Sequence, residues 1–388
     1  MRLPFLNARL QGLGTSIFAE MSALANATGS VTLGQGFPDT DGPDIVKQAA
    51  IDAIREGRGN QYPPGPGVLE LRRAVADHQR RFYGIELNPD TQVLAVAGAT
   101  EGIASAMLSL LETGDEVITF EPFYDSYPAT IAMAGAIRKP VTLHAPAYAL
   151  DVDALRAAVT DRTRLILLNT PHNPTGKVFT RDELTAIAEL AVERDLLVVS
   201  DEVYEHLVFD GEHIPICTLP GMAERTVTIS SMGKTFSFTG WKTGWVTGRP
   251  ELVTAVKTSK QFLTYVGVGP FQYAAAAGLA MDDAYYRSFR DDLQAKRDHL
   301  CAGLAEAGFE VYRPQGTYFI TTSIVPFGES DGYAFCRSLP ERCGLVAVPC
   351  SVFYDDQAAG RHLVRFAFCK RFEVLDEAVA RLKGLHAS

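Results

Sequence analysis

Short apolar runs alternate with longer amphipathic segments between residues 69 and 248. Several of the runs are rich in Val, Ile and Leu without strict alternation, which is typical of strands covered on both faces. Thr180 and Glu183 have the spacing of a helix capping box, and Leu184, Ile187 and Ala188 follow at helical spacing. The pattern therefore predicts an α/β layer with a mostly parallel sheet. The predicted strands are 92–98, 116–122, 137–143, 164–170, 196–201, 226–231 and 244–248.

The last third of the chain has a different pattern. A long amphipathic segment at 285–307 leads into the strand-like stretches 317–323, 345–349 and 362–368, and a terminal helix is predicted near 372–385. We expect these elements to form a smaller α+β domain, joined by the residues before position 37, which show no obvious sheet of their own. The predicted division is a large domain over residues 38–280 and a small domain built from 1–37 and 281–388.

Composition narrows the class of protein. A chain of 388 residues can bury a substantial core, and its formal net charge of -10 argues against a nucleic-acid or anionic-membrane surface. No apolar run approaches the ~20 residues of a membrane-spanning helix, and the first residues lack a signal-peptide pattern. The six cysteines include no Cys-x-x-Cys pair, so we expect reduced thiols and a cytoplasmic protein.

Two lysines mark the strongest candidate chemistry. Lys234 lies in the turn-like sequence Ser231-Met232-Gly233-Lys234, and Lys242 follows in Gly240-Trp241-Lys242. A lysine in such a setting can form a Schiff base with an aldehyde cofactor such as pyridoxal phosphate. Lys242 and the Ser231 hydroxyl are then candidates for the cofactor phosphate.

A further candidate for the phosphate lies at a predicted strand-to-helix turn. Gly98, Ala99 and Thr100 open a helix there, and small residues let backbone N–H groups approach an anion near the helix N-terminus. A Gly-rich turn can equally reflect packing between strand and helix. This motif therefore supports a phosphate site only in combination with Lys234 and Lys242.

Polar residues follow two of the predicted strands. Asn173 and Asp201 both come just after apolar strands, whose carboxyl ends form the ligand crevice of an open α/β sheet. Asp201 could pair with a protonated pyridine nitrogen, although Asp also serves as a helix cap. Tyr204 could donate a hydrogen bond to a ring hydroxyl and Tyr124 could stack on the ring, but either could be an ordinary packed aromatic residue.

Arg365 interrupts the apolar strand 363–368, where burial of its charge requires an anion. A substrate carboxylate and a structural salt bridge are the two alternatives. His172 and His206 flank the motifs, but no His, Cys, Asp or Glu cluster has the sequence spacing of metal ligands, so we expect both to be structural and no metal to bind. A Gly-x-Ser-x-Gly elbow of a serine hydrolase is absent.

The combined motifs resemble the fold-type I, pyridoxal-phosphate-dependent aminotransferases of class I/II over essentially the whole chain. The motifs that carry the resemblance are Leu33-Gly34-Gln35-Gly36-Phe37-Pro38, Asn60-Gln61-Tyr62, Asn169-Thr170-Pro171-His172-Asn173-Pro174, Ser231-Met232-Gly233-Lys234 and Leu363-Val364-Arg365-Phe366. Within the class, the chain is most similar to the kynurenine/glutamine/methionine branch. It is also similar to actinobacterial proteins assigned as N-succinyldiaminopimelate aminotransferases, which share the stretches 18–24 and 62–67.

The resemblance implies a large domain with a mostly parallel seven-stranded sheet, a smaller α+β domain, and a role for each motif residue. Lys234 is implied to be the Schiff-base lysine and proton shuttle, and Asp201 the partner of the pyridinium nitrogen. The ring is implied to contact Asn173, Tyr204 and Tyr124, and the phosphate Gly98, Ala99, Thr100, Ser231 and Lys242. The substrate is implied to contact Arg365, Gly36, Asn173 and Phe18.

The same resemblance implies a homodimer in which Tyr62 reaches the phosphate of the neighbouring subunit. Many members of the class have arginine at the position of Lys242, whereas the kynurenine branch has lysine. This departure therefore favours membership of the kynurenine branch. The expected reaction moves an amino group between an L-amino acid and a 2-oxo acid in ping-pong order. N-succinyldiaminopimelate as the specific substrate and a cysteine-conjugate β-lyase on the same fold remain the alternatives.

A rival from another class is a ligand-sensing regulator of the same fold. Such regulators carry an N-terminal DNA-binding domain, for which we expect no room before Leu33, and the acidic charge also disfavours DNA.

Overall fold

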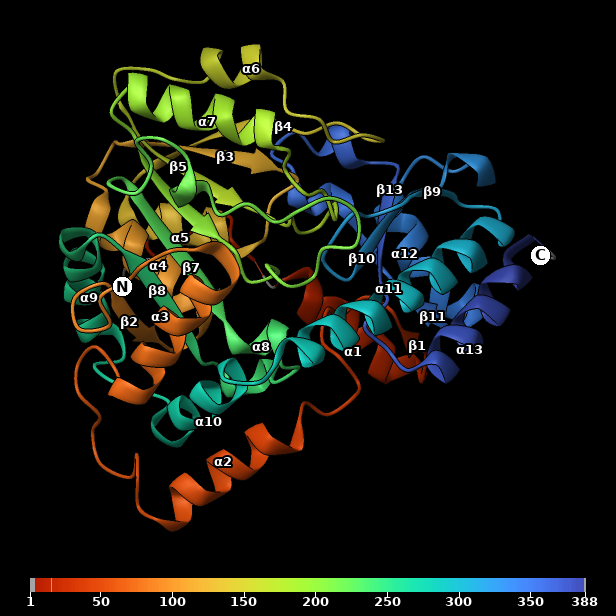
Figure 1. The fold of residues 1–388 in the computed structure, drawn as a ribbon. Coiled ribbons are helices and arrows are strands. Elements are labelled where there is room, and N and C mark those ends of the chain that lie inside the picture. Colours follow the sequence, from red (N-terminus) through yellow and green to blue (C-terminus); the bar gives the residue numbers. More distant parts are fainter. Residues whose placement is uncertain (1–3, 15, 387–388) are drawn as a thin grey trace.

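The computed structural model describes residues 4–14 and 16–386. Its larger part is built on a seven-stranded sheet in the order β2-β8-β7-β6-β5-β3-β4, and its smaller part lies to the right in Figure 1. The strands of the large sheet are β2 (Val93–Val96), β3 (Glu116–Glu121), β4 (Ile137–Thr142), β5 (Thr163–Asn169), β6 (Leu197–Asp201), β7 (Thr226–Ser231) and β8 (Gly244–Gly248). Every strand predicted between residues 92 and 248 is confirmed.

The large sheet is parallel except at β8, which runs antiparallel to both β2 and β7. Strands β7, β6, β5, β3 and β4 pair in parallel, so their carboxyl ends meet at one edge. Neighbouring residues of one strand face opposite sides of a sheet. In β5, Ile166 and Leu168 pack with Leu184 of α7 (Arg181–Glu193), whereas Leu165 and Leu167 pack with Ile103 of α4 (Gly98–Leu110).

Helices cover both faces of this sheet, which explains why its strands are apolar without alternation. In Figure 1, α7 and α6 (Val152–Ala157) cover the upper face. Thr180 caps α7 through the predicted capping box with Glu183. The other helices of the larger part are α2 (Asp44–Arg55), α3 (Leu69–Tyr83), α5 (Ser126–Ala134), α8 (Met232–Thr235), α9 (Pro250–Leu263) and α10 (Gly269–Leu279).

The smaller part contains an antiparallel four-stranded sheet in the order β12-β13-β10-β9. Its strands are β9 (Glu310–Tyr312), β10 (Phe319–Ser323), β12 (Val348–Pro349) and β13 (Leu363–Ala367). Short β1 (Val31–Thr32) pairs in parallel with β11 (Leu345–Val346). The helices are α1 (Ile17–Thr28), α11 (Asp283–Glu306), α12 (Gly332–Cys343) and α13 (Phe372–Leu382).

The N-terminal residues pack with the smaller part, as expected. Ile17, Met21 and Leu33 share one hydrophobic cluster with residues of β10 and β13. The strands β1 and β9 were not predicted, because two or three residues are too few to show a period in sequence. The predicted strand at 345–349 is instead divided into β11 and β12, which pair in different sheets. The exact domain boundaries at residues 38 and 281 stay a prediction.

Two further sequence expectations can be compared with the structure. All six cysteines are free thiols, as predicted. Within residues 4–14 and 16–386, the helices are all too short or too polar to cross a membrane.

Candidate active site

One pocket of about 250 Å³ collects the predicted site residues at the carboxyl ends of the parallel strands. Strands β5, β6 and β7 deliver residues to it from the large sheet, while α1 and β13 deliver others from the smaller part. Of the predicted residues, those that line the pocket are Phe18, Gly36, Gly98, Ala99, Thr100, Tyr124, Asn173, Asp201, Tyr204, Ser231, Lys234, Lys242 and Arg365. Tyr62 is the predicted residue that does not line it.

Asp201 ends β6 at the floor of the pocket and is 4% exposed. Tyr127 donates a hydrogen bond of 2.7 Å to Asp201 Oδ2. Burial raises the pKa of the Asp201 carboxyl to about 6, while the Tyr127 hydrogen bond opposes this shift. Among the described residues, no lysine, arginine or histidine forms an ion pair with Asp201. A buried carboxylate in this state favours a cationic ligand such as a protonated ring nitrogen.

Lys234 lies on the one-turn helix α8, immediately after β7. Its Nζ is 5.8 Å from the ring centroid of Tyr204 and 5.5 Å from that of Tyr318. In the described part of the chain, its amine has no hydrogen-bond acceptor. Burial lowers the pKa of Lys234 to about 8, with a smaller contribution from the positive charge of Lys242. A useful fraction of this amine is therefore neutral near physiological pH, as a nucleophile or a base requires.

The N-terminus of α4 provides the predicted anion cradle. Gly98 has φ of +75°, and a Cβ at this position would lie 3.2 Å from Lys242 Nζ. The absence of a side chain at Gly98 therefore brings the Lys242 ammonium next to the first N–H groups of a 13-residue helix. Ser231, at the end of β7, lines the same pocket. Positive charge, helix dipole and hydroxyl donor together suit a phosphate group.

Arg365 approaches the pocket from β13 and is 1% exposed. It donates hydrogen bonds of 3.1 Å to Asn173 Oδ1 and 3.0 Å to the carbonyl of Gly34. Its buried Nε has no partner among the described residues, and no carboxylate there forms an ion pair with it. The structural salt bridge considered for Arg365 is therefore not formed, which leaves this guanidinium available for a carboxylate ligand.

Aromatic side chains surround the guanidinium. Arg365 lies 4.0 Å from the ring centroid of Phe319 and 5.1 Å from that of Phe18, which reaches across from α1. Tyr318 donates a hydrogen bond of 2.6 Å to the carbonyl of Gly36. A Cβ at Gly36 would lie only 2.4 Å from the Phe319 ring, so glycine allows this close approach. The pocket wall beside Arg365 is thus apolar.

Tyr124 and Tyr204 both face the pocket. Burial raises the pKa of Tyr124 to about 12 and raises that of Tyr204 further, so both phenols stay neutral and can donate a hydrogen bond. Tyr204 packs edge-on against Tyr318, with ring centroids 5.3 Å apart.

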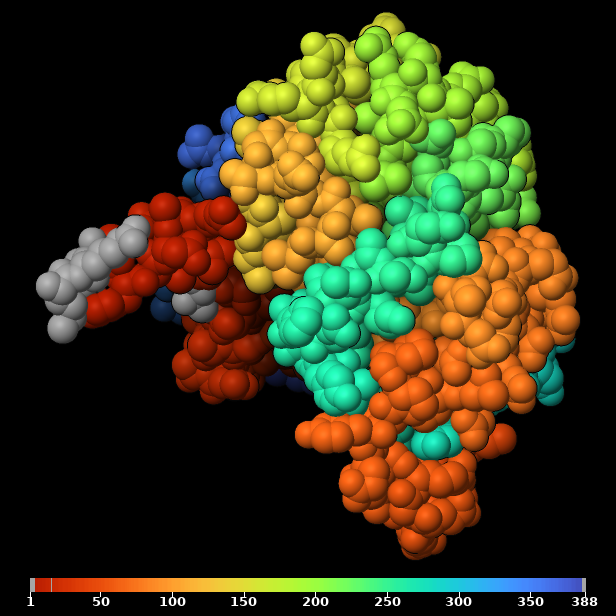
Figure 2. All heavy atoms as spheres, turned by 90° about the vertical axis from the view of Figure 1, so that its left-hand side faces the viewer, coloured from red at the N-terminus to blue at the C-terminus, as the bar shows by residue number. Residues whose placement is uncertain are grey.

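Tyr62 lies outside the pocket of its own chain. It is 81% exposed, and its ring packs edge-on against that of Tyr265 with centroids 5.3 Å apart. Figure 2 shows this face, where the teal segment near residue 265 runs beside the orange segment near residue 60. The predicted contact of Tyr62 with a neighbouring subunit stays a prediction.

Two residues that support the site were missed in the sequence. Tyr127 holds the Asp201 carboxylate, and Asn169 accepts a hydrogen bond of 2.7 Å from the Asn173 N–H. Asn169 also donates to the backbone carbonyl of Asp201 at 2.9 Å, which ties the ends of β5 and β6 together. Asn169 could have been found as a polar residue at the end of an apolar strand. Tyr127 carries no such signal, because its partner is 74 residues away.

The pocket residues fit pyridoxal phosphate. The chain offers a partly neutral lysine for an aldehyde, a buried carboxylate for a ring nitrogen, and the Gly98–Lys242 cradle for a phosphate. These groups line a single pocket together with a buried arginine that lacks an anion.

Comparison with known proteins gives a consistent result. The model of the family "Aminotransferase class I and II" matches residues 28–382. The chain is 53% identical to the probable N-succinyldiaminopimelate aminotransferase DapC of Mycobacterium tuberculosis, covering 97% of this chain and 98% of that protein. It is 37% identical to the methionine aminotransferase of Escherichia coli, covering 97% and 98%.

A solved structure agrees with this likeness. The structure of N-succinyldiaminopimelate aminotransferase from Mycobacterium tuberculosis superimposes with a TM-score of 0.96 at 53% identity, covering 98% of this chain and 100% of that one. Together with the pocket geometry, these matches confirm the fold and the class of reaction expected from the sequence. The chain belongs to the aminotransferase class I and II family, whose members depend on pyridoxal phosphate, and it is an enzyme that transfers amino groups.

Proposed function

We propose that this enzyme holds pyridoxal phosphate in the pocket around Lys234 and moves an amino group between an L-amino acid and a 2-oxo acid in ping-pong order. The observation that carries the proposal is that two basic side chains in one pocket each have a nitrogen without a hydrogen-bond partner among the described residues. Lys234 has a free amine for the aldehyde, and Arg365 has a free guanidinium edge for the substrate α-carboxylate.

Each pocket residue has a role in this proposal. Gly98, Ala99, Thr100, Ser231 and Lys242 would hold the phosphate. Asp201, held by Tyr127, would keep a proton on the ring nitrogen, while Tyr204 and Asn173 would contact the ring hydroxyl and Tyr124 the ring face. When bound, the cofactor withdraws electrons from the substrate α-carbon.

Lys234 would then move the proton. Its lowered pKa leaves the amine able to accept the α-proton and to return it to the carbon that the cofactor aldehyde would supply. Arg365 would fix the carboxylate in the plane of its guanidinium, so that the α-carbon faces Lys234. The aromatic wall around Arg365 would exclude water from this step.

We further propose N-succinyldiaminopimelate as the physiological amino substrate. The support is the 53% identity over nearly the whole length to a protein described as acting on that compound. Methionine and aromatic amino acids are the second candidate, favoured by Phe18 and Phe319 in the pocket wall and by the 37% identity to a methionine aminotransferase.

A homodimer is part of the proposal. Tyr62, Phe262 and Tyr265 are exposed on one face, with Tyr62 and Phe262 each 81% exposed, and an apolar surface of this kind is typical of an interface. In such a dimer, Tyr62 would contact the phosphate bound to the partner.

The test is a half-reaction with purified holoenzyme. One amino acid at a time is supplied without an acceptor, and the released 2-oxo acid is quantified against active sites. The proposal expects about one 2-oxo acid per site without acceptor and continuous turnover once 2-oxoglutarate is added.

The donor panel contains N-succinyldiaminopimelate, methionine, kynurenine and a cysteine S-conjugate. The highest kcat/KM with N-succinyldiaminopimelate supports the specific role, and a preference for methionine or kynurenine supports the second candidate. Sustained release of pyruvate and ammonia from the cysteine conjugate without acceptor would instead establish the lyase. If no donor releases a 2-oxo acid, the proposed chemistry of Lys234 is wrong.

A further inference from the structure

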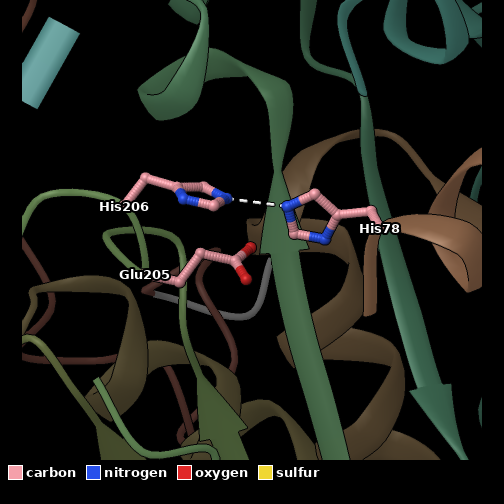
Figure 3. A group of neighbouring side chains, drawn as sticks. All are labelled: His78, Glu205 and His206. Carbon is pink, nitrogen blue, oxygen red and sulfur yellow. Dashed lines mark hydrogen bonds between the residues drawn. The ribbon is translucent and has the colours of Figure 1, made fainter. Parts of the chain in front are cut away.

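A second group of ligating side chains lies behind the active site. His78 of α3 and His206 bring their Nε2 atoms to 2.7 Å from each other. Glu205 places a carboxylate oxygen near both, and the three ligand atoms lie within 4.8 Å of one another. Figure 3 shows the Glu205 carboxylate on one side of the gap between the two rings. The histidines are 128 residues apart, which is why no spacing in the sequence revealed the group.

The Glu205 carboxylate is incompletely satisfied. Glu205 is 4% exposed, and its Oε1 accepts a hydrogen bond of 2.7 Å from Ser230. Its buried Oε2 has no partner in good hydrogen-bond geometry among the described residues, although the Tyr83 hydroxyl lies close to the carboxyl. No lysine or arginine in the described part of the chain forms an ion pair with it. An unpaired carboxylate beside two imidazole nitrogens calls for a cation.

Two of the candidate ligands have polar neighbours that could orient them, as the ligands of a metal ion usually have. Gln79 lies 3.4 Å from His78 Nδ1, and Ser230 orients Glu205, so two of the three candidate ligands already have outer-shell partners. The nearby Arg81 pairs with Asp283 on the surface, and His213 pairs with Glu202 at 2.9 Å. Arg81 is thus engaged elsewhere, whereas His213 bonds to Glu202 and also lies near enough to Glu205 to interact electrostatically with its carboxyl.

A route for the ion also exists. Glu205 and His206 line a second cavity of about 500 Å³, bordered by Tyr83, His213 and Tyr286 and separate from the active-site pocket. The cavity provides space for a water molecule as a further ligand. His206 is partly buried, and its ring packs against those of Phe82 and Tyr286.

We propose that His78, His206 and Glu205 form a site for a divalent transition metal of the Zn²⁺ type. Two imidazole nitrogens and one carboxylate oxygen, with an open position toward water, match the ligand set that Zn²⁺ accepts. Tetrahedral bonds of about 2.0–2.1 Å put two nitrogens roughly 3.3 Å apart, so the rings separate by about 0.6 Å on binding. This proposal replaces the expectation from the sequence that no metal binds.

The metal would fasten α3 to the segment after β6. Asp201, the last residue of β6, and Tyr204 just after it line the active-site pocket, whereas Glu205 and His206 line the second cavity. The ion would thus anchor the backbone that carries two proposed cofactor contacts, without contacting the substrate.

The test uses tag-free holoenzyme that has been treated with a chelator and dialysed. Calorimetric titration with Zn²⁺ is expected to give one equivalent per chain, and Zn²⁺ is expected to raise the Tm. Co²⁺ is expected to give visible d–d absorption typical of a tetrahedral site, whereas Mg²⁺ and Ca²⁺ give no effect. Absence of stoichiometric Zn²⁺ binding to the wild-type chain would overturn the proposal.

Variants assign the ion to this site rather than to the bound cofactor. Glu205→Gln keeps the shape of the side chain and should weaken Zn²⁺ binding at least about 100-fold, more than loss of an outer-shell partner does. His78→Gln and His206→Gln should abolish the Co²⁺ absorption. The matched control is His299→Gln, an exposed histidine paired with Asp376, which should bind like wild type. If the well-folded Glu205→Gln and His206→Gln variants bind Zn²⁺ with wild-type affinity, the site lies elsewhere.

Discussion

The Tyr127 hydroxyl lies 2.7 Å from Oδ2 of Asp201 and donates a hydrogen bond to it. Tyr127 is on α5, which follows β3, whereas Asp201 ends β6, so the bond connects two separate elements at the floor of the pocket. The bond stabilises the ionised carboxylate and fixes which way it points. Tyr127 is therefore a positioning residue for Asp201.

Removal of that hydroxyl should weaken the ring contact of Asp201. Tyr127→Phe loses a charge-assisted hydrogen bond of about 1.5–3 kcal/mol, so we expect kcat to fall about 10-fold or more. The pKa of Asp201 should rise, because the bond holds it down, so the acidic limb of the kcat/KM profile should shift to higher pH. Asp201→Asn should cost orders of magnitude more in kcat. An unchanged pH profile in Tyr127→Phe would contradict the positioning role.

Lys234→Ala should abolish turnover, because Lys234 is the pocket amine whose pKa burial lowers and the one proposed to bind the aldehyde. The variant should still bind the cofactor non-covalently through the Gly98–Lys242 cradle, which equilibrium dialysis would measure. Lys257, which is partly exposed on α9 and does not line the pocket, serves as the matched control when it is changed to Ala. Residual transamination near the wild-type rate in Lys234→Ala would disprove the assignment.

Arg365→Lys should raise KM for the amino acid with little change in cofactor affinity. Lysine keeps the charge but loses the planar fork that binds a carboxylate at two points, so we expect KM to increase about 10- to 100-fold. Steady-state kinetics and a cofactor titration together separate the two effects. A variant with normal KM but weak cofactor binding would place Arg365 in a structural role.

The lowered pKa of Lys234 also affects stability. Without cofactor, the folded protein releases this proton near pH 8, whereas the unfolded chain keeps it to near pH 10.5. The unfolded state thus binds more protons in this interval, and the contribution of Lys234 to stability becomes more favourable as pH rises through it. Lys234→Met should therefore raise the Tm of the cofactor-free protein by a few degrees at pH 7, and the difference should shrink by pH 10. Equal Tm values for the wild type and Lys234→Met at pH 7 would argue against an unfavourable buried charge on Lys234.

Tyr62 provides a test of the dimer. Tyr62→Phe should weaken cofactor binding only if the hydroxyl reaches a phosphate, because within its own chain the ring contacts Tyr265 outside the pocket. Mixing the inactive Tyr62→Ala and Lys234→Ala chains should restore part of the activity, since a mixed dimer would contain one intact site. Failure of mixed chains that demonstrably exchange subunits would show that Tyr62 acts in its own subunit or not at all.

The local pattern of apolar and polar residues was sufficient to predict most strands of the large sheet and the polar residues that follow them. Asn173 and Asp201 could be predicted because strand ends in a parallel sheet meet at a common edge. The pairing of Arg365 with Asn173 could not be predicted, since it joins β13 to the loop after β5 across 192 positions of the sequence. For the same reason, the contacts of Tyr127 with Asp201 and of His78 with His206 could not be predicted. They depend on how helices pack and not on any sequence period.

Strand β7 contributes adjacent serines to opposite sides of the large sheet. Ser231 lines the active-site pocket, while Ser230 bonds to Glu205 in the second group. Successive side chains on a strand alternate in direction, so a slip of one residue in the pairing of β7 with β6 would exchange the two serines. A single-residue insertion or deletion in this strand would disturb both places at once. Either serine can therefore be substituted separately, whereas a change in the length of β7 would alter both places together.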